Sequence, residues 1–188
     1  MPKGKSFTVM IGGLGGQGAL LFGRLLAEAG MSKYKHVLFF PNYGGLVRGG
    51  ASECTVTLSD ERISSPVVLE PEAAIAMSTA SLKDYEKRLK PGGLLFLDGA
   101  VTPGKIDRQD IKVIDISATQ AAVEMGDNRV SNLIFLGAYL RVSGVGSVEL
   151  VEKVLEKKLS GGRREALLAL DKQALRRGVE LASKIKAA

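Results

Sequence analysis

A glycine-rich segment near the N-terminus constrains the fold of this chain more than any other feature. A short apolar run, residues 7–11, precedes it, and a helical pattern follows at about residues 17–29. Between them, Gly13, Gly15 and Gly18 have the spacing G-x-G-x-x-G. Glycines in such a turn let a phosphate group approach backbone N–H groups at the positive end of a helix. The segment therefore predicts the strand, turn and helix that open a nucleotide-binding type of α/β unit.

The second half of a dinucleotide-binding fingerprint is missing. Such a unit needs an Asp or Glu at the end of its second strand, roughly 20 residues after the glycines, to bind a ribose hydroxyl. No acidic residue lies between Glu28 and Glu53. The predicted second strand, residues 37–40, is followed instead by a glycine-rich loop at residues 41–50. NAD is therefore disfavoured, whereas NADP, with Arg48 on its 2′-phosphate, stays open.

The rest of the chain alternates between strand and helix patterns. Residues 52–58 place Cys54, Val56 and Leu58 on one face, which predicts a half-exposed antiparallel strand. Residues 63–69 are its expected partner strand. Further buried strands are predicted at residues 73–77, 94–97 and 113–116, and further helices from 78 or 81 to 89 and at 119–125, 131–142, 147–159 and 164–186. This order predicts an α/β fold: a Rossmann-like, mostly parallel sheet with helices on both faces, a short antiparallel insertion and a C-terminal helical segment.

Length and composition set limits on function. The 188 residues, 45% of them hydrophobic, are expected to form a single domain over residues 1–188, with its helical part at about 147–188. One cysteine, Cys54, excludes an intrachain disulfide, a self-contained iron–sulfur cluster and a four-cysteine zinc site. The absence of a long apolar run or a signal-type start predicts a cytoplasmic protein without a membrane segment.

The formal net charge of +6 comes mainly from the last third of the chain. The cationic residues there alternate with Glu and Leu at helical spacing and have no aromatic residues among them. This pattern is typical of a solvated helix face, so nucleic acid is not an expected partner. The residues are Lys153, Lys157, Lys158, Arg163, Arg164, Lys172, Arg176, Arg177, Lys184 and Lys186.

Several single residues could take part in binding or catalysis, but each also has a plain structural interpretation. Arg48 closes the second glycine-rich loop and either binds a phosphate or carboxylate group or is an ordinary surface arginine. Cys54 lies on the apolar face of its strand and is expected to be a buried, inert thiol, and His36 is the only histidine. Asp98 ends a buried strand and is either a functional group or a cap of the next turn. Asn132, near a helix start, is expected to be a cap or turn residue.

Two motifs in combination resemble a known family. The first is Gly12-Gly13-Leu14-Gly15-Gly16-Gln17-Gly18; the second is Tyr43-Gly44, followed by Arg48-Gly49-Gly50-Ala51-Ser52-Glu53-Cys54. Together they are similar to the gamma subunit of the 2-oxoacid:ferredoxin oxidoreductases. The similarity continues through Ile63-Ser64-Ser65-Pro66, Leu82, Tyr85, Leu89-Lys90-Pro91-Gly92-Gly93, Asp98, Asn132 and Leu136-Gly137-Ala138, and so covers about residues 7–178.

The resemblance implies a subunit of an enzyme that oxidatively decarboxylates a 2-oxoacid to an acyl-CoA and reduces ferredoxin. It implies alpha, beta and ferredoxin-like delta partners, which hold thiamine diphosphate, Mg and iron–sulfur clusters. This chain would be a structural and substrate-side component with no catalytic residue or metal of its own. Pyruvate, 2-oxoglutarate and ketoisovalerate are among the substrates of the family.

Two functions follow from these observations. The first is the gamma subunit, in which Gly13, Gly15, Gly16, Gln17, Gly18, Tyr43, Arg48, Gly49 and Gly50 would contact a cofactor or substrate such as coenzyme A. The second is a stand-alone Rossmann-type NAD(P)-binding module or reductase. A homodimer of the chain is compatible with both. In either case the two loops are expected at the same edge of the sheet, because parallel strands place their strand-to-helix loops there.

Overall fold

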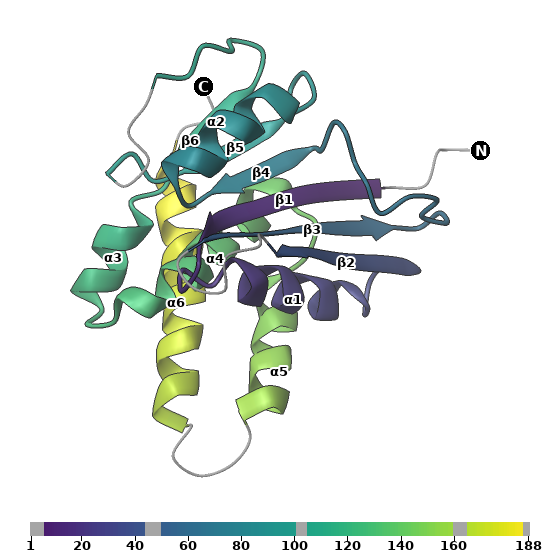
Figure 1. The fold of residues 1–188 in the computed structure, drawn as a ribbon. Coiled ribbons are helices and arrows are strands. Elements are labelled where there is room, and N and C mark those ends of the chain that lie inside the picture. The colour runs from purple at the N-terminus through teal and green to yellow at the C-terminus, as the bar shows by residue number, and fades with distance from the viewer. Residues whose placement is uncertain (1–5, 44–49, 101–104, 160–164, 186–188) are drawn as a thin grey trace.

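The computed structural model describes residues 6–43, 50–100, 105–159 and 165–185. In these residues, six strands form one sheet with the order β2-β3-β1-β4-β5-β6 (Figure 1). The strands are β1 (Ser6–Leu14), β2 (His36–Tyr43), β3 (Ala51–Ser59), β4 (Ala73–Ala76), β5 (Leu94–Leu97) and β6 (Lys112–Asp115). Each coincides with a segment predicted as a strand, although β1, β2 and β3 are longer than expected.

The sheet is mostly parallel, as the sequence predicts. β4, β5 and β6 continue in parallel from β1, whereas β3 runs antiparallel to both β1 and β2. The antiparallel insertion is therefore β3, which separates β1 from β2. The partner strand expected at residues 63–69 is wrong: this segment is irregular, and Val67 and Leu69 are 63% and 78% exposed. The segment cannot pair with β3, because β3 already has a partner strand on each side.

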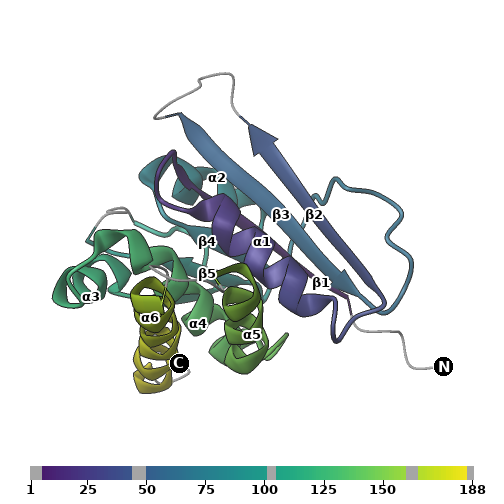
Figure 2. The ribbon, with the colours of Figure 1, turned by 90° about the horizontal axis from the view of Figure 1, so that it is seen from below.

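Helices cover both faces of the sheet (Figure 2). α1 packs on the face of β1, β2 and β3, with the C-terminal helices beside it, and α2 packs on the opposite face. The helices are α1 (Ala19–Gly30), α2 (Thr79–Arg88), α3 (Ala118–Glu124), α4 (Ser131–Ser143), α5 (Val148–Leu159) and α6 (Glu165–Lys184), with a short 3₁₀ helix at Asn128–Val130. The glycine pair expected to separate the last two helices lies outside the described residues.

The buried face of α1 differs from the one expected. Leu25 and Ala29 are buried as predicted, but Leu21 is 45% exposed. Phe22 and Leu26 are buried instead, at the three- and four-residue spacings that complete a stripe with Leu25 and Ala29. α2 begins as expected, because the Ser78 hydroxyl accepts a hydrogen bond of 3.2 Å from the backbone N–H of Ser81.

The core is organised around α4, which is buried from Asn132 to Leu140. α6 crosses it at very short range, because Gly137 of α4 faces the backbone of Leu175 and Gly178 of α6 faces the backbone of Ile134. A Cβ atom at either glycine would overlap a carbonyl oxygen of the other helix. This contact holds the C-terminal helices against the body that carries the glycine turn.

The basic C-terminal helices form ion pairs with acidic residues. Lys158 pairs with Glu28 of α1 at 2.6 Å, and Arg176 pairs with Glu152 at 2.8 Å. Other cations of α5, such as Lys153, are exposed, as expected of a solvated face. Among the helices of the described residues, none is both long and apolar enough to cross a membrane.

Candidate functional site

The glycine turn lies at the carboxyl end of β1. β1 continues to Leu14, so Gly12 and Gly13 belong to the strand and only residues 15–18 form the turn. The turn needs glycine at two positions, because Gly16 and Gly18 have φ values of 99° and 78°. α1 begins directly afterwards, and no side chain caps its first turn. Its first N–H groups therefore form a positive helix end next to the turn.

Gln17 ties the turn to the neighbouring strand. Its side-chain Oε1 accepts a hydrogen bond of 2.6 Å from the backbone N–H of Leu14. Its Nε2 donates a hydrogen bond of 3.0 Å to the carbonyl oxygen of Met77, the residue after β4. A Cβ on Gly13 would lie 2.5 Å from Oε1 of Gln17, so glycine is needed there to admit this side chain. Gln17 thus fixes the carboxyl ends of β1 and β4 relative to each other.

Asn132 fixes the other side of the turn. Its Nδ2 donates a hydrogen bond of 3.1 Å to the carbonyl oxygen of Gly18, and the residue is 1% exposed. Its Oδ1 accepts a hydrogen bond from Leu133 N–H at 2.9 Å, consistent with a residue near a helix start. The expectation of a cap or turn residue is wrong, because Asn132 is the second residue of α4 and no side chain caps this helix. Its side chain instead fixes the glycine turn.

The second glycine-rich loop ends on the turn. The N–H of Gly15 donates a hydrogen bond of 2.9 Å to the carbonyl oxygen of Gly50. This contact places Gly50, the last residue of the second loop, on the glycine turn. The expected reason is wrong, because the second loop joins the antiparallel strands β2 and β3 and leads to no helix. Arg48 and Gly49 lie outside the described residues, as does the side chain of Tyr43, the last residue of β2. The predicted contacts of these residues with a cofactor stay predictions.

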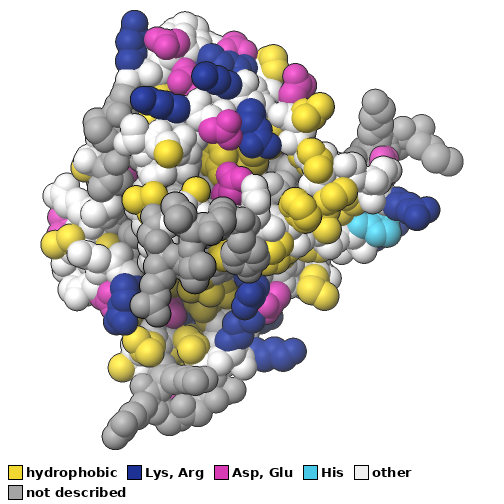
Figure 3. Space-filling model, viewed as in Figure 1, with side chains coloured by type: hydrophobic (Ala, Val, Ile, Leu, Met, Phe, Trp, Pro, Cys, Tyr) yellow, Lys and Arg dark blue, Asp and Glu magenta, His cyan; other side chains and the backbone are white. Residues whose placement is uncertain are grey.

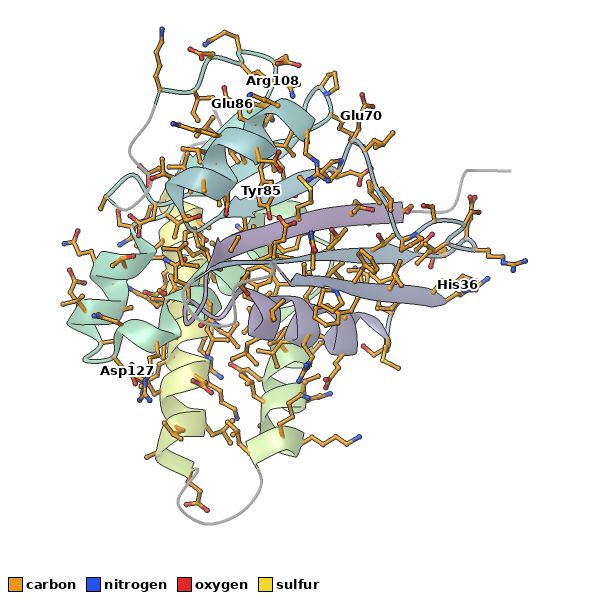
Figure 4. All side chains as sticks on the ribbon, viewed as in Figure 1. His36, Glu70, Tyr85, Glu86, Arg108 and Asp127 are labelled. Atoms are coloured by element: carbon orange, nitrogen blue, oxygen red, sulfur yellow. The ribbon has the colours of Figure 1, made fainter. Side chains whose placement is uncertain are left out.

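A carboxylate and a phenol lie beside Gly12 of β1, on the α2 face of the sheet. The hydroxyl of Tyr85 donates a hydrogen bond of 3.1 Å to Glu53, which also accepts one of 2.6 Å from Asn42. Figure 4 shows Tyr85 between α2 and β1. Burial, together with the nearby Glu53 carboxylate, raises the pKa of Tyr85, so the phenol stays protonated at neutral pH. The pair borders a cavity of about 180 Å³.

Gly12 makes room for this pair. It is the register partner of Glu53 in β3, and a Cβ on Gly12 would overlap the hydroxyl of Tyr85. The sequence pattern did not predict the contact between Tyr85 and Glu53. A glycine that the G-x-G-x-x-G spacing does not require, directly before that motif, was the signal that a side chain approaches the strand there.

The other singled-out residues have structural roles. Cys54 is 2% exposed, and burial raises the pKa of its thiol to about 12. His36 lies at the far end of β2 from the turn (Figure 4), so it is no base for Cys54. Asp98 accepts hydrogen bonds from the N–H groups of Ala100 and Thr119 at 3.1 and 2.7 Å. No cluster of three or more potential metal-ligating residues occurs in the part of the chain that the structure describes.

The glycine turn combines a positive helix end with a strand order unlike that of an NAD-binding unit. The positive end of α1 and the glycine turn are present, and no acidic residue lies in the first turn of α1. β3 stands between β1 and β2, so the end of β2 is displaced from the position beside β1 where a ribose-binding acid belongs.

Comparison with known proteins identifies this architecture. A model of the pyruvate ferredoxin/flavodoxin oxidoreductase family matches residues 8–181. The chain belongs to this family. The resemblance seen in the two glycine motifs is therefore confirmed.

Individual relatives are consistent with this assignment. The chain is 34% identical over 145 residues to ketoisovalerate oxidoreductase subunit VorA of Methanothermobacter marburgensis, covering 77% of this chain and 30% of that protein. The chain thus spans about a third of the length of its first curated relatives. It is 32% identical to 2-oxoglutarate synthase subunit KorC of Methanocaldococcus jannaschii, covering 87% of this chain and 90% of that protein.

A solved structure has the same fold over nearly its whole length. The keto/oxoacid ferredoxin oxidoreductase gamma subunit of Geobacter sulfurreducens superposes with a TM-score of 0.79 at 30% identity, covering 95% of this chain and 97% of that chain.

Proposed function

We propose that this chain is the gamma subunit of a multi-subunit 2-oxoacid:ferredoxin oxidoreductase, which converts a 2-oxoacid to an acyl-CoA and reduces ferredoxin. The observation that carries the proposal is the hydrogen bond from Gly15 N–H to Gly50 C=O, which joins the glycine turn to the end of the second loop in a member of this family. Relatives that the chain covers almost entirely are named as subunits of such enzymes, which supports the same role here.

Thiamine diphosphate, Mg and iron–sulfur clusters belong to the partner subunits in this proposal. The residues of this chain do not fit a cluster, because Cys54 is the only cysteine and its Sγ lies 3.5 Å from the carbonyl oxygen of Ala19 inside the core. The chain contributes binding and positioning at the glycine turn. Its proposed partners are alpha, beta and ferredoxin-like delta chains.

We assign the acyl acceptor, coenzyme A, to the rim formed by the glycine turn and the loop that ends at Gly50. The positive end of α1 and the guanidinium of Arg48 would act together on its phosphates. Gly16 and Gly18 keep the turn open for close approach of backbone N–H groups. Gln17 would act by holding this turn against β4.

The test is Arg48→Ala in the reconstituted enzyme. Losing one charge-assisted contact costs about 1.5–3 kcal/mol, so the KM for coenzyme A should rise roughly 10- to 150-fold. Lys83→Ala, on an exposed surface of α2, is the matched control and should leave KM unchanged. Unchanged kinetics in Arg48→Ala would assign the loop to packing or to a partner contact.

Two simpler measurements separate the proposed subunit from a stand-alone reductase. Co-expression with alpha and beta chains should give a stable complex, with on the order of 1,000 Å² or more buried per side. The isolated chain should bind NADH and NADPH no tighter than about millimolar, or roughly −4 kcal/mol. A micromolar constant for either nucleotide, or a lone monomer after co-expression, would contradict the proposal.

A further inference from the structure

A groove runs along the open edge of the sheet, far from the glycine turn. It has a volume of about 1020 Å³ and lies between α1, β2 and the segment of residues 62–66. Its walls include Ala27, Met31, Val37, Leu38 and Phe39. Figure 2 shows the connection from β3 to β4 passing outside β2 without forming a strand. β2 is the edge strand, so its outer side faces this groove.

The side to which the backbone N–H and C=O groups of β1 point fixes the side to which those of the neighbouring strands point. The carbonyl oxygens of Thr8 and Gly12 accept hydrogen bonds of 3.1 and 2.8 Å from residues that flank β4. Backbone polar groups alternate in direction along a strand, so those of Ile11 point the other way, toward β3. Ile11 is the register partner of Cys54 in β3. The backbone polar groups of Cys54 therefore point toward β1 and away from β2.

The same alternation shows to which side the backbone groups of β2 point. Pro41 is the register partner of Cys54, so the pair is not hydrogen-bonded and Pro41 directs its backbone away from β3, where a missing N–H is tolerated. Val37 and Phe39 lie four and two residues before Pro41, so they also direct their N–H and C=O groups to the open edge. Within the described residues, nothing hydrogen-bonds to these outward groups. β2 thus presents a short row of unused donors and acceptors to the groove.

The charges around the groove are predominantly positive. Arg24, Lys35 and Arg62 line it, and none has a hydrogen bond or ion pair with another described residue. The acidic residue in the lining, Glu28, is already paired with Lys158 at 2.6 Å. Figure 3 shows the histidine at the end of this edge, beside a Lys or Arg side chain and a group of exposed hydrophobic side chains. The groove therefore combines apolar walls, free cations and an open strand edge.

We propose that an extended, acidic segment of a partner polypeptide binds in this groove as an additional strand on β2. Strand addition uses main-chain hydrogen bonds for affinity and side-chain pockets for specificity, and both are present here. The chain's own termini are poor occupants, because Lys3, Lys5 and Lys186 are basic. A second copy of β2 is disfavoured, because residues 35–43 include no acid. The proposal rests on the proposed function only in expecting the partner among the other subunits.

A labelled peptide tests the charge requirement on the isolated full chain. The probe is a fluorescein-labelled peptide of alternating Glu and Val, compared by fluorescence anisotropy with one of alternating Lys and Val. The acidic peptide should bind at least about tenfold more tightly, with an affinity that falls as salt rises. Arg24→Glu with Lys35→Glu should weaken its binding about tenfold or more.

Lys83→Glu with Lys87→Glu is the matched control, because these exposed α2 lysines give the same change of net charge. It should change the affinity by less than about twofold. Equal binding of the acidic and basic peptides, or no binding, would overturn the proposal. Either result would leave the assembly and coenzyme A tests of the proposed function unaffected.

A backbone variant tests strand addition itself. Val37→Pro removes one outward N–H without removing a hydrogen bond to β3. Val37→Ala only shortens the side chain and keeps this N–H. Val37→Pro should lower the affinity for the acidic peptide at least about fivefold more than Val37→Ala does. A second probe, N-methylated at alternate residues, should bind as weakly to the unmodified protein, which keeps the test decisive if Val37→Pro does not fold. Full binding of the methylated probe would overturn the proposal.

Discussion

The side-chain amide of Asn132 donates a hydrogen bond of 3.1 Å to the carbonyl oxygen of Gly18, which lies 114 residues earlier in the chain. The contact joins the first turn of α4 to the turn that precedes α1. Because Asn132 is buried and Gly18 has a φ of 78°, neither residue has a close substitute. The geometry of the proposed ligand site therefore depends on the packing of the C-terminal helices.

Asn132→Ala should lower the free energy of unfolding by about 1–3 kcal/mol, because it removes buried hydrogen bonds and leaves a small void. Gly18→Ala should lower it by a similar amount, since its Cβ would overlap the Asn132 side chain and strain the backbone. Urea unfolding followed by circular dichroism measures both changes. If the loss of unfolding free energy in the double variant equals the sum of the losses in the single variants, the two residues do not act together.

Gly178→Ala should be more damaging than most single substitutions in this chain. Its Cβ would overlap the carbonyl oxygen of Ile134, and backbone atoms of a buried helix have little room to move. We expect a loss of more than about 3 kcal/mol in the free energy of unfolding. Val123→Ala, at a 57% exposed position of α3, is the control and should change stability by less than about 0.5 kcal/mol. A well-folded Gly178→Ala protein of unchanged melting temperature would contradict the close helix contact.

Much of the sheet could be predicted because buried parallel strands have a simple sequence pattern. The apolar runs at β4 and β5 are bounded by polar and glycine-rich segments, and both appear as predicted. The alternation of Cys54, Val56 and Leu58 likewise predicted an antiparallel strand. Its opposite face is not exposed throughout as expected, because Thr57 is only 5% exposed. The same approach failed at residues 63–69, because β3, the expected partner, already pairs with β1 and β2, and because Pro66 interrupts the apolar pattern.

The site was harder to predict than the fold. The glycine spacing located the turn, because positive φ values leave a direct mark on composition. Gln17 and Asn132 carry no such mark, since their partners Met77 and Gly18 are distant in sequence and are backbone groups. A backbone acceptor is offered by every residue, so no pairing pattern in the sequence could have identified these contacts.

Asp127 should titrate at unusually low pH. Hydrogen bonds from Arg129 hold the pKa of its carboxyl at about 2, below the ordinary value of 3.8. A lowered folded-state pKa adds stability above the unfolded pKa, and this contribution is lost as the pH falls from about 4 toward 2. Carboxyl-carbon NMR titration of the folded protein measures the pKa, and Arg129→Gln should return it toward 3.8. An ordinary pKa for Asp127 in the unmodified protein would rule out a persistent pair.

Cys54 should be almost inert in the native protein and is therefore a useful probe of its opening. Burial raises the pKa of the thiol from 9.0 to about 12, so at pH 8 its reactive thiolate is about 1,000-fold rarer than in the unfolded chain. A raised pKa also means that the stability linked to the protonated thiol is lost as the pH rises from about 9 toward 12.

The rate of modification by a disulfide reagent at pH 8, with and without guanidinium chloride, measures the protection of Cys54. Gly23→Ala supplies the matched variant, because its added Cβ would overlap the Cys54 sulfur and should force α1 away from β3. We expect faster modification in this variant than in the unmodified protein, since local opening exposes the thiol. Rapid modification of the unmodified native protein, at a rate near that of the unfolded chain, would show that the α1–β3 contact opens freely and that the first turn of α1 is not a fixed platform for an anion.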